Sequence, residues 1–242
     1  MKKLSALLLF TASATSALAG VTEYEVGPFD RIAVRGDFNV VYSANQDSIG
    51  YARFESDTDL TSALEVSNNN GRLQIKENLS DKHAKPFPTI YVYSDYIVGV
   101  ENEGDGNLEA DLKMKSPAFS AKLIGNGKIV CRNVNATKVS ASIATGNGTI
   151  VLSGAAVEAN YSLTGSGVIQ ADALVADEID CKVLGTGSIG CNPVELLDVR
   201  GAGTTKVYYT GNPKINKVGG AKIIRMQPET EVPTVVTAGS EE

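Results

Sequence analysis

The sequence predicts an all-β protein folded as a right-handed parallel β-helix, or β-solenoid, with about 20 residues per coil. Three observations support this fold class. A Gly-x-Gly motif recurs six times between residues 104 and 203, and its successive first glycines lie 16 to 21 residues apart. Each motif follows a segment in which polar and apolar residues alternate, such as residues 119–123. A short β-branched run then follows the motif, as at residues 128–130.

Residues 1–19 are predicted to be a secretory signal peptide. Lys2 and Lys3 form a basic start, residues 4–10 form an apolar run, and Ala17-Leu18-Ala19 is a small-x-small cleavage site. The alternative is a buried N-terminal helix. The apolar run is too short to span a membrane, and no later stretch is long enough, so no membrane span is expected after signal removal. The chain is therefore expected to be exported to the periplasm, the cell surface or the medium.

Residues 20–226 are predicted to form a single solenoid domain that begins less regularly than it continues. Its first strands are expected at residues 29–34, 38–42, 64–66, 73–75, 90–93 and 97–100. The Asn-rich stretch 68–71 predicts a turn, and residues 76–88, which hold His83, predict an exposed loop. Residues 227–242 lack periodicity and are predicted to be a disordered tail.

The Gly-x-Gly motifs are predicted to be stacked corners of the coil. A corner needs a positive φ, which glycine adopts freely, and a Cβ would crowd the next corner. The middle residues Asp105, Asn126, Asn147 and Ser166 could form a hydrogen-bonded ladder, which Thr186 and Ala202 follow. No helical pattern follows any copy, which argues against phosphate binding. The structural corners are Gly104, Gly106, Gly125, Gly127, Gly146, Gly148, Gly165, Gly167, Gly185, Gly187, Gly201 and Gly203, with a degenerate copy at Gly219-Gly220.

Coil geometry follows from the repeat length. A strand rises about 3.3 Å per residue, so roughly 20 residues can trace one coil around a flat core about 10 Å thick. Coils stacked at about 4.8 Å would pair each strand with its copy in the next coil. Parallel crossovers of this kind are almost always right-handed.

Composition excludes several classes of partner and site. Processing before Gly20 leaves 20 basic residues against 28 acidic ones, a net charge of −8, so nucleic acid is not an expected partner. Cys131, Cys181 and Cys191 form no C-x-x-C pair, and free buried thiols are predicted to predominate over a disulfide. Cys131 and Cys191 would lie three coils apart, roughly 14 Å, which is beyond disulfide reach. No metal and no cofactor are expected, since His83 has no His or Cys nearby.

An enzyme is the alternative to a binding module, because some β-helices cleave polysaccharides. The candidate carboxylates Asp172, Asp177, Glu178 and Asp180 cluster at a turn, where a solvated polar surface is the simpler interpretation. Arg132 and Lys138 lie on a similar turn, but no acidic cluster is expected to face them. Gly165-Ser166-Gly167 is one of six equivalent copies of the repeat, so Ser166 is not interpreted as a catalytic nucleophile. We therefore predict no catalytic residues.

The ordered set of motifs resembles the GIN-domain family, known as the head domain of putative auto-transporter adhesins. The resemblance is carried by Phe29-x-x-Ile32-x-Val34-x-Gly36-x-Phe38-x-Val40, the Gly-x-Gly series, Val207-Tyr208-Tyr209-x-Gly211-Asn212-Pro213 and the glycine pair near 219. It covers about residues 26–226 and implies a right-handed β-helix of the bacterial envelope without catalytic residues. Residues 120–207 contain a single aromatic, Tyr161, so an outer-membrane translocator barrel is not expected here.

The leading functional hypothesis is an exported, non-enzymatic envelope or cell-surface module, either adhesin-like or structural. Its partner would be a glycan or an envelope protein, bound on flat parallel sheets. Tyr161, Tyr208 and Tyr209 offer only weak support for a platform that stacks sugars. A carbohydrate-active lyase or hydrolase is the alternative. A homo-oligomer is possible, but a bactofilin-like polymer of stacked solenoids would be cytoplasmic, which the export signal argues against.

Overall fold

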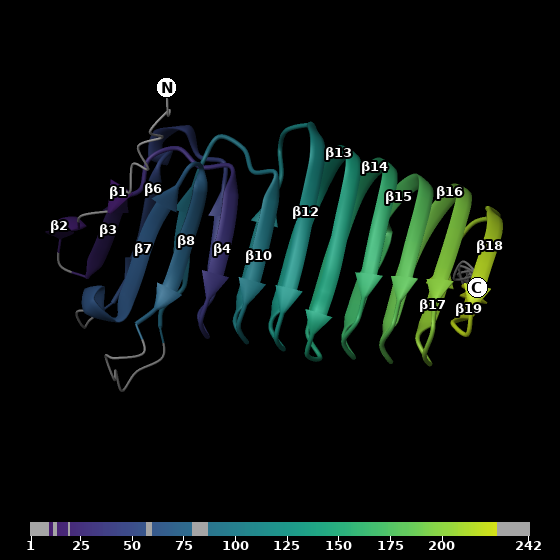
Figure 1. The fold of residues 1–242 in the computed structure, drawn as a ribbon. Coiled ribbons are helices and arrows are strands. Elements are labelled where there is room, and N and C mark those ends of the chain that lie inside the picture. Colours follow the sequence, from purple (N-terminus) through teal and green to yellow (C-terminus); the bar gives the residue numbers. More distant parts are fainter. Residues whose placement is uncertain (1–9, 12–13, 19, 57–59, 79–86, 227–242) are drawn as a thin grey trace, which may run out of the picture.

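The chain folds into an elongated β-solenoid of about six turns with roughly 20 residues per coil, as predicted (Figure 1). The structure is a computed structural model that describes residues 10–11, 14–18, 20–56, 60–78 and 87–226. The described part of the chain is 67% strand and 3% helix, the helices being the 3₁₀ turns η1 (Gln46–Ser48) and η2 (Thr61–Ala63). None of the helices in the described part of the chain has the length and apolar character needed to cross a bilayer.

Each coil has two long sides, which we call side A and side B. Side A contains the strands that precede a corner, and side B contains those that follow one. Side A runs in the order β7 (Leu64–Asn69), β8 (Arg72–Glu77), β4 (Arg31–Arg35), β10 (Gly99–Glu103), β12 (Ser116–Ile124), the second halves of β13 (Lys128–Thr145), β14 (Thr149–Leu163), β15 (Val168–Val183) and β16 (Ser188–Gly201), and β18 (Lys214–Gly219).

Side B lies across the core from side A. It runs in the order β3 (Val21–Glu25), β6 (Tyr51–Glu55), β9 (Ile90–Tyr93), β5 (Val40–Ser43), β11 (Asn107–Asp111), the first halves of β13 to β16, β17 (Lys206–Tyr209) and β19 (Lys222–Arg225). The two N-terminal strands β1 (Phe10–Thr11) and β2 (Ala14–Leu18) add to the outer edges of β7 and β3.

Alternation within each strand builds the core. In β12 the side chains of Phe119, Ala121 and Leu123 are buried, while Ser120 and Lys122 between them are exposed. Successive coils pair in register, so each inward residue lies above its counterpart; Ala141, Tyr161 and Cys181 form one such column. The core is therefore a set of parallel columns that run along the solenoid.

The second bend of each coil differs from the polar turn that the sequence predicts. Strands β13 to β16 continue through this bend as single strands of 14 to 18 residues. The bend is made by a bulge between Cys131 and Val134, where Asn133 has a φ of 56°. The Nδ2 of Asn133 donates to Asp111 Oδ1 at 2.7 Å in the preceding coil. Backbone pairing between coils thus persists around the bend. The sequence pattern does not reveal the bend, because the strand does not end there.

The N-terminal coils are stacked out of sequence order. β4 and β5 form one coil, but the chain then moves outward to β6, β7, β8 and β9 before it returns to β10. As a result β4 lies between β8 and β10, and β5 lies between β9 and β11. The pairs β3–β6, β6–β9 and β7–β8 are antiparallel, and these strands form the N-terminal end of the solenoid (Figure 1).

Several predicted boundaries shift by a few residues. β10 begins at Gly99 rather than at residue 97, and Lys76 and Glu77 belong to β8 rather than to the predicted loop. The rest of that loop, including His83, lies largely outside the described residues, as does the predicted tail over residues 227–242. Most of the predicted signal peptide also lies outside them, so its removal stays a prediction.

Glycine occupies the corners chiefly because the coils approach closely there. A Cβ on Gly165 would lie 2.7 Å from the carbonyl oxygen of Gly146, and one on Gly203 would lie 2.6 Å from that of Gly185. The expected positive φ occurs at Gly125, Gly146 (87°), Gly201 and Gly203, but not at the other eight predicted corner glycines, of which Gly165 is one. The sequence-based expectation that Gly165 adopts a positive φ is therefore wrong, and steric exclusion by the preceding corner explains this glycine.

The middle residues of the corners form the expected hydrogen-bonded ladder, but in two segments. Asp105 Oδ1 accepts from the backbone N–H and the Nδ2 of Asn126, both at 3.1 Å, and Asn126 Oδ1 accepts from the N–H of Asn147 at 3.1 Å. Thr186 Oγ1 donates to Ser166 Oγ at 2.9 Å in the second segment. The ladder begins one corner earlier than predicted, at Asp37, whose Oδ1 accepts from the N–H of Asp105 at 3.0 Å.

Candidate binding groove

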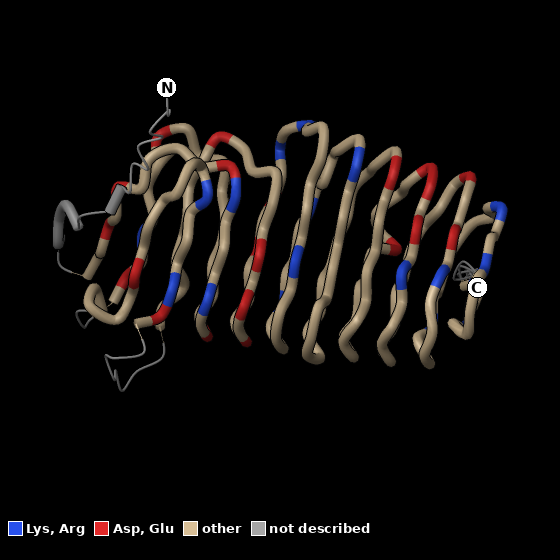
Figure 2. Tube along the Cα trace, viewed as in Figure 1, with Lys and Arg blue, Asp and Glu red and all other residues tan. Residues whose placement is uncertain are grey.

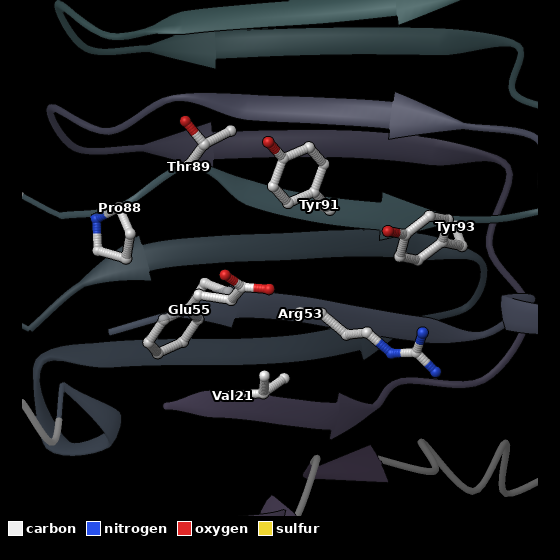
Figure 3. A pocket seen from close by; sticks show the side chains of 8 residues that line it. Val21, Arg53, Glu55, Pro88, Thr89, Tyr91 and Tyr93 are labelled. Atoms are coloured by element: carbon white, nitrogen blue, oxygen red, sulfur yellow. The ribbon is translucent and has the colours of Figure 1, made fainter. Parts of the chain in front are cut away.

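A groove of about 590 Å³ lies on the outer surface of side B, near the N-terminal end (Figure 3). Strands β3, β6 and β9 and the segment that leads into β9 contribute its walls. The lining residues are Val21, Arg53, Phe54, Glu55, Pro88, Thr89, Tyr91 and Tyr93.

Alternation along β6 and β9 points Arg53, Glu55, Tyr91 and Tyr93 outward, while Phe54 on β6 is buried in the core. Ala52 and Val92 lie opposite each other in the antiparallel pair, and both are fully buried in the core. Their neighbours therefore face solvent, with Tyr51 opposite Tyr93 and Arg53 opposite Tyr91. Tyr91 and Tyr93 project from one strand and Arg53 and Glu55 from the strand beside it (Figure 3). The result is a mixed aromatic and charged surface on a rigid sheet.

Arg53 is held in place by four neighbours. Its guanidinium carbon lies 5.4 Å from the ring centre of Tyr51 and 5.7 Å from that of Tyr93, within the range of cation–π attraction. Its Nε forms an ion pair with Glu23 on β3, and its Nη1 donates to Ser48 Oγ at 3.2 Å. A planar donor group is therefore fixed between aromatic rings before any ligand arrives.

This combination of groups suits a sugar. Tyr91 is 44% exposed, and its ring offers a flat apolar face. Arg53 supplies hydrogen-bond donors, Glu55 supplies acceptors, and Thr89 supplies both. Hydroxyl groups at the edge of a sugar ring need such partners, while its C–H face packs on an aromatic ring.

The tyrosines predicted from the sequence as a weak sugar-stacking platform do not belong to this groove. Tyr161 is only 1% exposed in the core, and Tyr208 and Tyr209 lie on β17 near the opposite end. The available signal was the alternation Tyr51-Ala52-Arg53 and Tyr91-Val92-Tyr93, which places aromatic rings on one outward face. That these two segments are neighbours depends on the β6–β9 pairing, which is not evident from local sequence.

Two of the four candidate carboxylates do meet in a groove, on side A. Glu178 and Asp180 line a shallow hollow of about 250 Å³ together with Glu158 and Asp198. Asp172 is exposed beside Gly190 and Asp177 is half-buried at the bend, so neither joins them. The expected cluster of four is therefore only partly assembled, and two other carboxylates complete the hollow.

Two cations pair with three of these four carboxylates. Arg200 binds Asp180 at 2.6 Å and Asp198 at 3.1 Å, and Lys138 binds Glu158 at 3.1 Å. All of these groups stand on the outside of one flat sheet, whereas glycosidic hydrolysis needs two acids on opposite sides of the bond. The arrangement resembles a charged surface ladder more than a catalytic pair.

The remaining candidates are accounted for by single contacts. Arg132 binds Glu109 at 3.3 Å, so each of the two candidate basic residues, Arg132 and Lys138, faces one carboxylate of a neighbouring coil rather than an acidic cluster. Within the described residues, no three His, Cys, Asp or Glu side chains are grouped in a way that could hold a metal ion. His83 lies outside that part of the chain.

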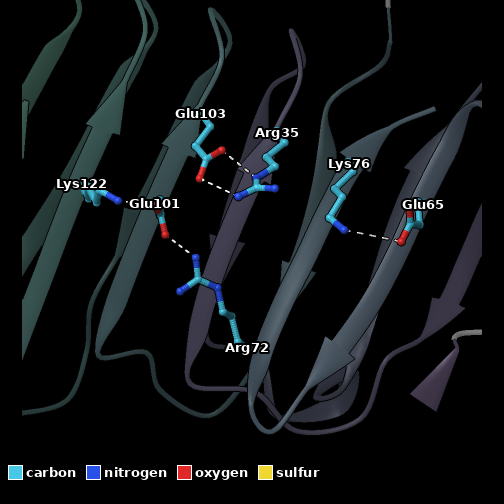
Figure 4. Close-up of polar contacts among 7 residues, drawn as sticks. All are labelled: Arg35, Glu65, Arg72, Lys76, Glu101, Glu103 and Lys122. Atoms are coloured by element: carbon cyan, nitrogen blue, oxygen red, sulfur yellow. Dashed lines mark hydrogen bonds and ion pairs between the residues drawn. The ribbon is translucent and has the colours of Figure 1, made fainter. Parts of the chain in front are cut away.

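A second polar hollow on side A is built from ion pairs between coils (Figure 4). Glu101 binds Arg72 on one side and Lys122, at 2.8 Å, on the other. Partial burial alone would raise the pKa of Glu101, but hydrogen bonds from Lys122 and Arg72 outweigh it and hold the pKa below its usual value. Arg35–Glu103 (2.7 Å) and Lys76–Glu65 (3.6 Å) extend the network, which fastens the out-of-order coils together.

All three cysteines are buried thiols without a disulfide. Cys131 and Cys191 both lie on side B, and Cys131 is followed in its column by Leu152. Burial raises the pKa of Cys131 to about 12. Cys181 lies across the core from Cys191, where the hydrogen bond that its thiol donates to the Cys191 sulfur, followed by burial, raises its pKa well above the usual value.

The chain matches one family and several solved structures. The model of the family described as "Putative auto-transporter adhesin, head GIN domain" matches residues 28–213. A "putative adhesin" from Bacteroides fragilis is 21% identical with a TM-score of 0.74, and the match covers 85% of this chain and 94% of that one. No curated protein matches the chain.

Two further solved structures share the fold. A "putative adhesin" from Parabacteroides merdae is 20% identical with a TM-score of 0.64, covering 86% of this chain and 95% of that one. A "putative lipid binding protein" from Parabacteroides distasonis is 20% identical with a TM-score of 0.62, covering 86% of this chain and 96% of that one. At such identities these likenesses establish the fold alone.

Proposed function

Because this chain belongs to the family of GIN head domains of "putative auto-transporter adhesins", we propose that it is an exported, non-enzymatic module that binds a glycan. The observation that carries the proposal is the side B groove, where Arg53 is fixed between tyrosine rings beside the exposed ring of Tyr91. The name of the family fits a protein that works outside the cytoplasm. The predicted signal peptide over residues 1–19 supports the same location.

The chemistry of the groove favours an uncharged or weakly charged sugar. Arg53 is already paired with Glu23, and Glu55 adds another carboxylate, so a strongly anionic ligand would meet repulsion. The C–H face of a pyranose would pack on Tyr91, while its hydroxyls would exchange hydrogen bonds with Arg53 and Thr89. A fixed arginine loses little freedom on binding, which favours affinity.

The groove is tested by glycan-array screening followed by calorimetry with the best ligand. We expect Tyr91→Ala to weaken binding at least tenfold, or about 1.4 kcal/mol. Arg53→Lys, which keeps the charge but loses the planar donors, should weaken it as well. Tyr96→Ala is the matched control, since Tyr96 is 48% exposed but does not line the groove. Equal losses for Tyr91→Ala and Tyr96→Ala, or no glycan bound at all, would contradict the proposal.

A polysaccharide-cleaving enzyme is the second candidate, favoured by the four carboxylates of the side A hollow. Their pairing with Arg200 and Lys138 argues against it. The test is a panel of polysaccharides incubated with purified protein and assayed for new reducing ends and unsaturated products. We expect neither. Turnover that survives repurification and is lost in Asp180→Asn would establish the enzyme instead.

A further inference from the structure

The two ends of the solenoid carry opposite charge. The strands at the N-terminal end, β3 and β7, contain Glu23, Glu25 and Glu65 and no basic residue. The last segment of the described fold, residues 214–225, spans β18 and β19 and contains Lys214, Lys217, Lys222 and Arg225 and no acidic residue. Only basic charges mark β18 in Figure 2. The outermost strands at the N-terminal end therefore carry negative charge, which Arg53 and Lys76 on the next strands partly offset by pairing with Glu23 and Glu65, and the other end is basic.

The acidic end can accept additional strands. In this chain β2 pairs antiparallel with the outer edge of β3, and β1 pairs with that of β7. Both added strands belong to the predicted signal peptide. Cleavage after Ala19 would remove them and leave two edges with unpaired backbone N–H and C=O groups.

The basic end also presents one open strand edge on each side. Among the described residues, β18 pairs only with β16, and β19 only with β17. All six residues of β18 are exposed, including Val218 at 66% and Ile215 at 39%. Ile215 continues the inward column of Leu197, so its exposure marks the place where a further coil would cover the core.

The two ends match in geometry. With the basic end of one copy on the acidic end of another, β18 would meet β7 and β19 would meet β3. The six residues of β18 would face the six of β7, and the four of β19 would face the five of β3. The strand directions make the β18–β7 pair antiparallel and the β19–β3 pair parallel. Backbone hydrogen bonds can form in both kinds of pair. Both sides of the solenoid would continue unbroken across the junction.

Charge favours contact between a basic end and an acidic end over contact between two ends of the same kind. Two basic ends, or two acidic ends, would repel. We propose that the processed chain assembles head to tail, with the basic end of one copy docked on the acidic end of the next. The assembly rests on signal removal and is independent of glycan binding.

The experiment is analytical ultracentrifugation of the protein exported and processed in a bacterial host, at low and high ionic strength. We expect the mean mass to rise with concentration at low salt and to fall when salt screens the charges. The acidic-end variant carries Glu25→Lys and Glu65→Lys, and the basic-end variant carries Lys214→Glu and Lys217→Glu. Each should be monomeric alone because its two ends no longer carry opposite net charge. In a mixture, the unaltered basic end of the first variant should bind the unaltered acidic end of the second.

The matched control reverses two charges on the middle coils, Lys128→Glu and Lys182→Glu, one on each side of the solenoid. This variant should assemble like the wild type. A wild type that stays monomeric at low salt overturns the proposal, as does a mixture that fails to assemble. Wild-type binding to anionic lipid vesicles without self-association would assign the basic end to a lipid surface, and would overturn it too.

Discussion

At the residue scale, the corner glycines are explained more often by the close approach of neighbouring coils than by a positive φ. Gly185 does not have a positive φ, yet a Cβ there would overlap the carbonyl oxygen of Gly165. The stacked corners leave no room between one backbone and the next. The sequence revealed the positions of these residues, but only the coil-to-coil distance explains why they are glycines.

The first prediction separates crowding from backbone strain. Gly185→Ala should lower the free energy of unfolding by about 1–3 kcal/mol, because the methyl group forces two corners apart. Gly220→Ala is the control, since its Cβ would lie 3.6 Å from the carbonyl oxygen of Gly203 and neither glycine position has a positive φ. Urea denaturation measures both variants. A loss for Gly220→Ala as large as that for Gly185→Ala would show that stacking is not the cause.

The ladder gives a second prediction at this scale. Asn126→Ala should cost about 1 kcal/mol, because it removes the acceptor for the Asn147 N–H and the donor to Asp105. Asn147→Ala should cost less, because the backbone N–H of Ser166 in the next corner donates to the Gly146 carbonyl at 2.9 Å and not to the Asn147 side chain. The two variants are compared by thermal and chemical unfolding. The reverse order of stability would contradict the ladder.

The thiols provide a third prediction. A folded pKa of about 12 keeps the Cys131 thiol protonated at neutral pH, and reactive thiolate forms only as the pH approaches that value. With all three cysteines buried, a thiol reagent should label none of them in the native protein and all of them in denaturant. Mass spectrometry without reduction should also show no Cys131–Cys191 link. Such a link would disprove the register of the stacked coils.

At the element scale, local pattern and long-range pairing contribute differently. Alternation and β-branching sufficed to predict the strands around residues 119–123 and 128–130 because each lies beside its own copy in the next coil. They did not predict that β4 would lie between β8 and β10, because the strand order depends on which edges meet. The groove was missed for the same reason, since Tyr51 and Tyr93 meet only through the β6–β9 pair.

The N-terminal element carries the fourth prediction. If residues 1–19 direct export, N-terminal sequencing of the protein from the cell envelope should begin at Gly20. The strands β1 and β2 would then be absent from the mature protein, which leaves the edges of β3 and β7 free. Replacing Ala17 and Ala19 by Leu should block cleavage and serves as the control. An unprocessed Met1 on protein from the cytoplasm would refute export.

At the scale of the whole molecule, each coil contacts mainly its two neighbours, so stability is distributed as in a one-dimensional chain. The repeat made this architecture predictable from the glycine spacing alone. The N-terminal end has its own antiparallel pairs, whereas β18 and β19 hold the other end through parallel pairing on one side among the described residues. The consequence of a defect should therefore depend on where along the solenoid it falls.

Gly146 and Gly219 allow a matched test of this dependence. Both have a positive φ, 87° and 103°, and a Cβ on either would overlap the carbonyl oxygen of the preceding corner. Valine at either position should therefore bring similar local strain, about 1–3 kcal/mol before crowding. Gly146 is stacked between Gly125 and Gly165, however, so valine there disturbs two junctions, whereas Gly219 follows Gly201 at the last described corner. Only their positions in the chain of coils differ.

We therefore expect Gly146→Val to lower the stability of the whole domain and Gly219→Val to loosen only the last coil. Chemical denaturation should show a lower midpoint for Gly146→Val and a nearly unchanged main transition for Gly219→Val. Hydrogen exchange should localise the second effect, with faster exchange in β18 and β19 and unaltered protection in β13 and β14. Equal midpoints for the two variants would mean that the solenoid unfolds as one unit, which would contradict the prediction that a defect at the last corner stays local.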